Sequence, residues 1–223
     1  MSRPDALPCD YDTDPDRWTS RPEAAKAAGD VHEIVATRVS AEGLSPLLDV
    51  GSGHGRLGDL LGAEITYLGI EHSPAQIARS TQPVILADAR SLPLKQESAG
   101  AVTALWMLYH LDDPLIAIRE AYRVLRPGGL FAASTSRRDD SSEVQPAQDP
   151  TPFDAEEAPA IVSEVFGEIE VQAWDQPMFT MPDRESVRLY LVSRMADPAL
   201  ADGVHTPVTI TKRGCLVWGR KAE

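Results

Sequence analysis

The stretch Leu47-Leu-Asp-Val-Gly-Ser-Gly-His-Gly55 decides the fold, because a short apolar run leads directly into a loop with three glycines. Glycine lets the backbone adopt positive φ angles and approach a ligand closely. In an open α/β sheet, ligands bind beyond the carboxyl ends of the strands, which is where such a loop lies. The stretch therefore predicts a first strand followed by a ligand-binding turn.

Apolar runs and helical patterns alternate on the carboxyl-terminal side of this loop. Further strands are predicted at residues 66–70, 82–86, 101–106, 130–134 and 169–174. The alternation between residues 47 and 136 indicates a parallel sheet with crossover helices. We expect an α/β fold with a doubly wound, mostly parallel, seven-stranded sheet that carries helices on both faces. At its edge we expect an antiparallel hairpin, residues 208–218, that turns at Lys212-Arg213-Gly214.

Capping residues and apolar spacing predict the helices. They are expected from Ser20 to Ala28, from Val31 to Gly43, after Gly55 through Leu61, from Ser73-Pro74, from Asp113-Pro114 to Pro127, from Asp154 to Phe166 with Pro159 inside, and after the cap Asp183. The length predicts a single domain over residues 1–223. Within it we expect cap or lid helices at 1–45, a ligand-binding core at 46–136, and a carboxyl-terminal part at 137–223 with a helical insertion at 178–204.

The composition limits the partners. The chain has 34 acidic and 21 basic residues, a net charge of −13 and a pI of about 4.8. Such a charge repels phosphate backbones and anionic lipid heads, which argues against nucleic acid and membrane partners. The first 16 residues lack the apolar stretch of a signal peptide. Cys9 and Cys215 are too few for a disulfide framework or a metal knuckle, so we expect a cytoplasmic protein without a metal.

The ligand of the glycine loop is ambiguous from the pattern alone. Gly53-x-Gly55-x-x-Gly58, with Glu71 further on, also fits the dinucleotide fingerprint. Asp49 favours a different ligand, because a carboxylate facing a pyrophosphate would be repelled, whereas a cationic amine would be stabilised. The amino-acid end of S-adenosylmethionine (SAM) carries such an amine, and Glu71 suits the ribose of either cofactor.

Five blocks of the chain together resemble the core of a class I SAM-dependent methyltransferase, the seven-strand Rossmann-like family, of the small-molecule type 11 kind. The blocks are residues 47–55, 69–73, 87–94, 106–114 and 119–129, and they cover roughly residues 46–136. One departure is that Ser52 and His54 stand where the family often has Cys and Thr or Asn. The order and spacing of five blocks are more specific than one glycine motif.

The resemblance implies a set of cofactor-binding residues. The methionine part would be held by Asp49 and the loop residues Gly51, Ser52, Gly53 and Gly55. Glu71 would bind the ribose, and Asp88 would bind the adenine amine, with His72 and Ala89 beside the adenine. Leu105 and Trp106 would flank the sulfonium.

Methyl transfer from a sulfonium is an in-line displacement that mainly requires alignment and exclusion of water. His110 is the candidate general base, and Tyr109 is a weaker candidate for the same role. Tyr11 and Trp18 are candidates for a lid that touches the substrate. Arg184 and Arg188 share a helix face and are candidates to meet an acidic substrate. His32 is interpreted as a surface or packing residue.

The function predicted from these residues is methyl transfer from SAM to an O or N atom of a small molecule, with C left open. Two alternatives stay open. The first is a non-catalytic SAM-binding or interaction protein. The second is an NAD(P)-dependent oxidoreductase, against which Asp49 and the lack of an evident Tyr–Lys pair argue.

Overall fold

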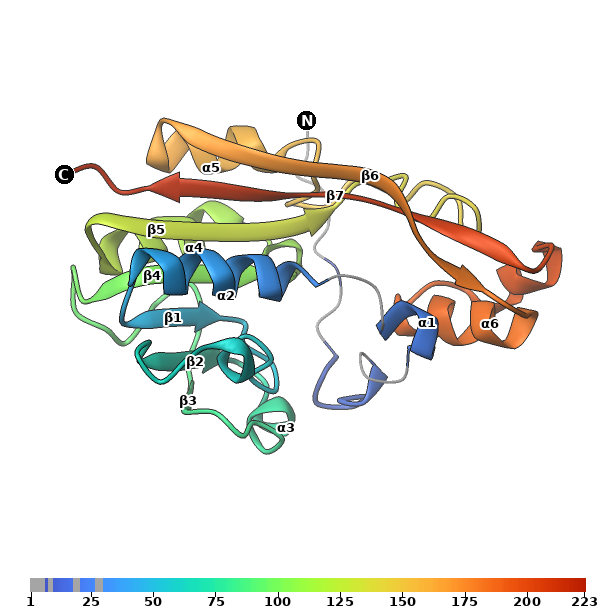
Figure 1. Cartoon of the computed structure of the whole chain (residues 1–223), viewed down its shortest axis with the longest axis horizontal. Coiled ribbons are helices and arrows are strands. Elements are labelled where there is room, and N and C mark those ends of the chain that lie inside the picture. Colours follow the sequence, from blue (N-terminus) through green and yellow to red (C-terminus); the bar gives the residue numbers. More distant parts are fainter. Residues whose placement is uncertain (1–6, 8–9, 18–20, 27–29) are drawn as a thin grey trace.

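The structure is a computed structural model, and it describes residues 7, 10–17, 21–26 and 30–223. Within this part of the chain, seven strands form one sheet in the order β3-β2-β1-β4-β5-β7-β6 (Figure 1). The strands are β1 (Leu47–Val50), β2 (Tyr67–Glu71), β3 (Val84–Leu86), β4 (Ala99–Leu105), β5 (Leu125–Ser136), β6 (Ile169–Met181) and β7 (Val208–Arg220). The predicted mostly parallel, seven-stranded α/β sheet is confirmed.

The antiparallel edge of the sheet is also confirmed, but the turn predicted at Lys212-Arg213-Gly214 is wrong. These residues lie within β7, which pairs antiparallel with both β5 and β6. Gly214 is needed there for a close approach, since a Cβ would come within 2.5 Å of the carbonyl oxygen of Thr135. Arg213 meets Asp175 across the sheet at 3.0 Å, so its charge is paired within the sheet.

The helices are α1 (Glu23–Lys26), α2 (Val31–Glu42), α3 (Pro74–Ile77), α4 (Pro114–Val124), α5 (Ala158–Phe166) and α6 (Arg184–Ser193). They cover both faces of the sheet because successive strand residues face opposite sides. On β5, Leu130 and Ala132 join the apolar cluster under α2, whereas Phe131 and Ala133 join the cluster that includes α4 and α5. The predicted helices on both faces are therefore confirmed (Figure 1).

The helix predicted after Gly55 is wrong. Residues 56–61 form turns and the short 3₁₀ helix η2 (Gly58–Leu60). Gly58 packs so closely that a Cβ would lie 3.0 Å from the ring of Tyr67. Because glycine disfavours a helix interior and is needed here for packing, close contact with β2 replaces helix formation.

Most helix ends follow the capping residues. Gly43 ends α2 with φ 62°, and the Ser73 hydroxyl accepts the backbone N–H of Gln76 at the start of α3. Pro159 lies in the first turn of α5, where a missing N–H is tolerated, so that helix begins at Ala158 and not at residue 154. The helix α4 ends at Val124, before Pro127, because β5 has already begun at Leu125. Ser20 and Ala28 lie outside the described residues.

The strands β6 and β7 extend beyond the rest of the sheet and carry α6 and the 3₁₀ helix η4 (Pro198–Gly203) between them (Figure 1). A third apolar cluster forms there, in which Ala25 of α1 and Met181 of β6 join Tyr190 and Leu191 of α6. The described residues contain no helix that is both long and apolar enough to cross a membrane.

Candidate functional site

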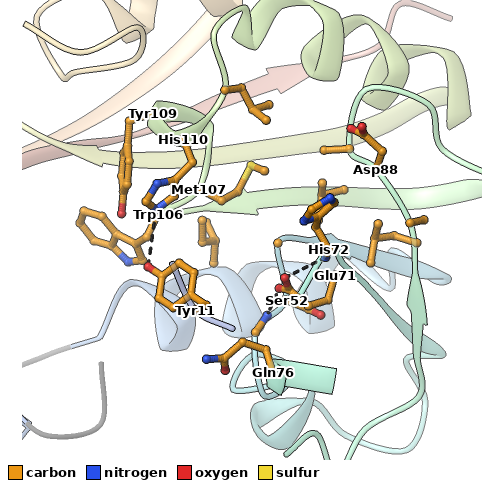
Figure 2. A pocket seen from close by; sticks show the side chains of 18 of the residues that line it. Tyr11, Ser52, Glu71, His72, Gln76, Asp88, Trp106, Met107, Tyr109 and His110 are labelled. Atoms are coloured by element: carbon orange, nitrogen blue, oxygen red, sulfur yellow. Dashed lines mark hydrogen bonds between the residues drawn. The ribbon is translucent and has the colours of Figure 1, made fainter. Parts of the chain in front are cut away.

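A cavity of about 290 Å³ lies beyond the carboxyl ends of β1, β2 and β4 (Figure 2). The strand β1 is the switch point of the sheet, because β2 and β3 lie on one side of it and β4 and β5 on the other. The structure brings most of the predicted site residues to this cavity. They are Tyr11, Gly51, Ser52, Gly53, Glu71, His72, Asp88, Ala89, Leu105, Trp106 and His110.

The glycine loop forms one wall of the cavity. Gly51 has φ 70° and Gly53 has φ 54°, which L residues with side chains rarely adopt. A Cβ on Gly51 would come within 2.7 Å of Met107, which follows β4. The hydroxyl of Ser52 is packed against β2, since a Cβ on Gly69 would lie 2.5 Å from it. The loop therefore depends on the absence of side chains at both glycines.

Glu71 links the glycine loop to the end of β2. Its carboxylate accepts the backbone N–H groups of Gly53, His72 and Ser73, each at 2.8 Å. The residue is 8% exposed and lines the cavity. A carboxylate offers about four lone-pair sites, so these three bonds leave about one site for a ligand hydroxyl.

Asp88 lies beyond β3, on the rim of the cavity (Figure 2). The guanidinium of Arg90 donates to both of its carboxylate oxygens at 2.7–3.1 Å, and the Arg90 backbone N–H adds a bond at 2.8 Å. These bonds hold the pKa of Asp88 below its usual value. The carboxylate is therefore charged and fixed in orientation.

Asp49, in β1 behind the glycine loop, and Gly55, at the end of the loop, do not line the cavity. Asp49 is 4% exposed and accepts hydrogen bonds from the Thr103 hydroxyl at 2.7 Å and the Tyr67 hydroxyl at 2.9 Å. Burial raises the pKa of this carboxyl above its usual value. A Cβ on Gly55 would meet Gln82 at 2.9 Å. Both residues therefore support the shape of the loop and lie outside the lining of the cavity.

His110 ends the 3₁₀ helix η3 (Leu108–His110), and the amino-terminal segment holds its ring. The ring Nδ1 lies 3.1 Å from the carbonyl oxygen of Leu7, while Nε2 lies 3.5 Å from the Tyr11 hydroxyl (Figure 2). A carbonyl oxygen only accepts hydrogen bonds, so Nδ1 carries the proton in the neutral ring. The lone pair is then on Nε2, which faces Tyr11.

Residues 10–17 connect η3 and α3 beside the cavity, which Tyr11 lines. Asp12 accepts the Ser73 hydroxyl at 2.6 Å and the Ala75 backbone N–H at 3.2 Å. The side chain of Gln76 donates to the carbonyl oxygen of Pro15 at 3.0 Å. Trp18, the other residue predicted for a lid, lies outside the described residues.

A second cavity, of about 1260 Å³, adjoins the first and shares Tyr11, Trp106, Tyr109 and His110 with it. Its walls come from β6, β7, α6, the segment at residues 135–154, and amino-terminal residues that include Arg21, Asp30 and Ile34. Trp106 has φ 58°, and its ring lies edge-on to Trp174 of β6 at 6.1 Å. The shared residues place Trp106 and His110 between the two cavities.

The sequence reasoning missed several residues that line the first cavity: His32, Arg56, Gln76 and Met107. His32 was interpreted as a surface or packing residue, yet it reaches the cavity from α2. The one available signal was the position of Met107 directly after the predicted Leu105-Trp106 pair. Arg188 points elsewhere, because it pairs with Asp202 and Glu185 on the surface. Among the described residues, no group of His, Cys, Asp and Glu is arranged to hold a metal ion.

Comparison with known proteins matches the same part of the chain as the predicted ligand-binding core. Residues 48–133 match the family model described as "Methyltransferase domain". The ubiquinone biosynthesis O-methyltransferase of Pseudomonas entomophila is 31% identical over 137 residues, which cover 55% of this chain and 59% of that protein. The enzyme of the same name from Xanthomonas campestris is 34% identical over 117 residues, or 48% of each chain. The chain thus spans about half of the curated relatives it matches.

Solved structures share the fold at low sequence identity. YcgJ protein from Bacillus subtilis has a TM-score of 0.63 at 16% identity and covers 87% of this chain and 100% of its own. A SAM-dependent methyltransferase from Archaeoglobus fulgidus has a TM-score of 0.57 at 15% identity, with 85% and 94% covered. The [4+2]-cyclase SpnF has a TM-score of 0.62 at 19% identity, with 86% and 81% covered. The predicted resemblance is confirmed for the core, whereas the fold by itself does not fix the reaction.

Proposed function

On the premise that residues 48–133 are a methyltransferase domain, we propose that this protein transfers a methyl group from SAM to an oxygen atom of a small molecule. One observation carries the proposal. Apart from Tyr11 and His32, the residues that line the smaller cavity belong to the stretch that the family model matches, and this cavity adjoins a larger one with room for an acceptor.

The residues of the smaller cavity suit SAM. Glu71 offers its carboxylate to a ribose hydroxyl, and Asp88 is a fixed acceptor on the rim for the adenine amine. Ala89 and Leu105 add apolar wall. Gly51 and Gly53 line the cavity with backbone alone, which lets the methionine part approach the loop closely. When bound, SAM supplies a methyl group on a sulfonium, which is already activated for in-line displacement.

Alignment of the acceptor and acceptance of its proton are assigned to residues that line both cavities. Trp106 and His110 meet the smaller cavity on one side and the acceptor cavity on the other. As the proposed base, His110 would accept the proton of an acceptor hydroxyl at Nε2, the ring nitrogen that faces Tyr11. Residues 10–17, of which Tyr11 lines the smaller cavity, would help to exclude water from it. Asp49 is a buried carboxylate behind the loop, and its proposed role is to support the loop and not to contact the ligand.

The acceptor class follows from the relatives and the charge. The curated relatives are named as O-methyltransferases, which favours oxygen over nitrogen or carbon as the methylated atom. The net charge of −13 disfavours nucleic acid, so a small molecule is the proposed acceptor.

Calorimetric titration with S-adenosylhomocysteine, NAD⁺ and NADP⁺ tests the cofactor. We expect micromolar binding of S-adenosylhomocysteine, no dinucleotide binding, and at least about tenfold weaker binding in Glu71→Ala. Glu164→Ala, on the exposed side of α5, is the matched control and should bind as the unmodified protein does. Dinucleotide binding would instead point to redox chemistry. Tight binding without product from any hydroxylated acceptor would favour a non-catalytic SAM-binding protein.

A further inference from the structure

The larger cavity carries a group of charged side chains that the proposed methyl transfer does not use. Arg194, at the end of α6, and Lys212, on β7, both line this cavity. Between them lies Asp140, which is 1% exposed. We call these three residues the Arg194 cluster.

The carboxylate of Asp140 is fully engaged within the cluster. Its Oδ2 pairs with Lys212 and, at 2.8 Å, with Arg194. Its Oδ1 accepts the backbone N–H of Arg213 at 2.7 Å. Lys212 also donates to the hydroxyl of Tyr190 at 3.1 Å. Within the cluster one carboxylate thus faces two cations, which leaves one positive charge in excess there. The cavity wall also carries carboxylates, among them Asp154 and Asp175, which pair with Arg138 and Arg213.

Arg194 is the cation of the cluster that has an unsatisfied donor. Its side chain is 18% exposed, and its Nε is buried without a hydrogen-bond partner among the described residues. A buried donor without a partner is costly, and Arg194 shares its carboxylate with Lys212, so the cluster favours an anionic ligand. A purely structural link between α6 and β7 needs only one of the two cations, because one is enough to neutralise Asp140.

Part of the cavity wall is aromatic. Trp106, Tyr109, Trp174, Phe179 and Tyr190 line it. Aromatic walls suit a planar, apolar body, which they contact edge-on or face-on. His110 lines the same cavity, so one molecule in it can meet both the candidate base and the Arg194 cluster.

We propose that the methyl acceptor is a planar carboxylic acid, whose carboxylate pairs with Arg194 while its hydroxyl faces His110. A carboxylate fits better than a phosphate ester, because the excess of one positive charge matches a monoanion at neutral pH. The planar guanidinium also matches a carboxylate in geometry. The inference rests on the proposed function, since it assigns the larger cavity to the acceptor.

The test compares acids with their neutral amides. Benzoate, 4-hydroxybenzoate, 3,4-dihydroxybenzoate and 2-naphthoate are titrated in the presence of S-adenosylhomocysteine, each beside the matching amide. We expect each acid that binds to do so at least about tenfold more tightly than its amide, with a ratio that falls as salt is added. This comparison needs only the unmodified protein, so it does not depend on the folding of a variant.

Arg194→Gln should reduce the acid-to-amide ratio to about one. Arg188→Gln is the matched control on the same helix, since Arg188 pairs with Asp202 on the surface, and it should keep the ratio. Equal binding of acid and amide, no binding of any acid, or equal ratios in the two variants would overturn the proposal. S-adenosylhomocysteine binding, measured separately, reports on the cofactor site, so loss of the acid preference alone does not contradict methyl transfer.

Discussion

The Nδ1 atom of His110 lies 3.1 Å from the carbonyl oxygen of Leu7, a residue 103 positions earlier in the chain. The backbone N–H of Leu7 in turn donates to the carbonyl oxygen of Tyr109 at 3.0 Å. The pair of bonds fixes the orientation of the ring and places the proton on Nδ1. A general base needs this kind of support, because its basic nitrogen must face the substrate.

His110→Gln should therefore lower kcat by about 100-fold or more, since the side chain loses its basic nitrogen. The affinity for S-adenosylhomocysteine should stay unchanged, because glutamine can still donate to Leu7. The measurement is a steady-state assay with the acceptor identified by screening, paired with calorimetry. Tyr11→Phe serves as the comparison and should lose less than about tenfold, since its hydroxyl is 3.5 Å from the ring. Full activity of His110→Gln would remove His110 from the mechanism.

Gly51→Ala should abolish detectable binding of S-adenosylhomocysteine and lower the free energy of unfolding by about 1–3 kcal/mol. The new methyl group would lie 2.7 Å from Met107, and φ is 70° at this position. Gly43→Ala is the matched control, because Gly43 has φ 62° but no atom within 4 Å of the added Cβ. It should cost about 1 kcal/mol and leave binding intact. Urea unfolding and calorimetry on both variants separate the backbone strain of a positive φ from the steric clash with Met107. Equal losses of S-adenosylhomocysteine affinity in the two variants would contradict the steric argument.

Asp30→Asn should destabilise the protein at pH 7 by about 1–2 kcal/mol. Burial raises the pKa of Asp30, but hydrogen bonds from His32 and Arg56 outweigh it and hold the pKa below the usual value of 3.8. A lowered pKa contributes stability that is present above about pH 4 and is lost as the pH falls through the folded-state pKa.

The stability difference between Asp30→Asn and the unmodified protein should therefore shrink between about pH 5 and pH 2, as followed by urea unfolding at several pH values. Glu185→Gln is the control, because the Glu185 side chain is 71% exposed, and it should change stability by less than about 0.5 kcal/mol throughout. A difference that stays constant with pH would show that the Asp30 contacts do not depend on its charge.

Cys215 should resist alkylation in the folded protein. Burial raises the pKa of its thiol to about 12, and the residue is 2% exposed. At about pH 8 only about one thiol in 10⁴ is then ionised, and the thiolate is the reactive form. In a Cys9→Ser background, iodoacetamide should modify Cys215 only after urea is added, as read by mass spectrometry. Rapid labelling without urea would mean that the centre of the sheet opens readily.

Local signals account for much of what the sequence predicted. Ser73 and Asp183 cap their helices through a side-chain oxygen that accepts a backbone N–H three residues on. Gly43 ends α2 because its αL conformation suits glycine. Each of these features depends on neighbours within one turn of chain, so a single sequence suffices to find it. The strand β1 was likewise predicted at its observed bounds, Leu47–Val50.

Lys212, Arg213 and Gly214 show where such reasoning fails. Two charges followed by glycine are typical of a turn, yet the residues lie in the middle of β7. Their charges are paired there by Asp140 and Asp175, which are 72 and 38 positions away from their partners. No local pattern contains these partners, and so no local pattern could predict the strand.

The sequence by itself determined the alternation of strands and helices, the glycine loop after β1, and the presence of Glu71 and Asp88 at strand ends. It did so because backbone preference and side-chain periodicity are properties of neighbouring residues. Only the tertiary structure decided that Asp49 lies behind the loop, held by Thr103, and that Leu7 orients His110. It also decided that Arg194 faces the larger cavity. These relationships join residues that are distant along the chain, and their energies depend on burial and hydrogen bonding that arise only when the whole sheet has formed.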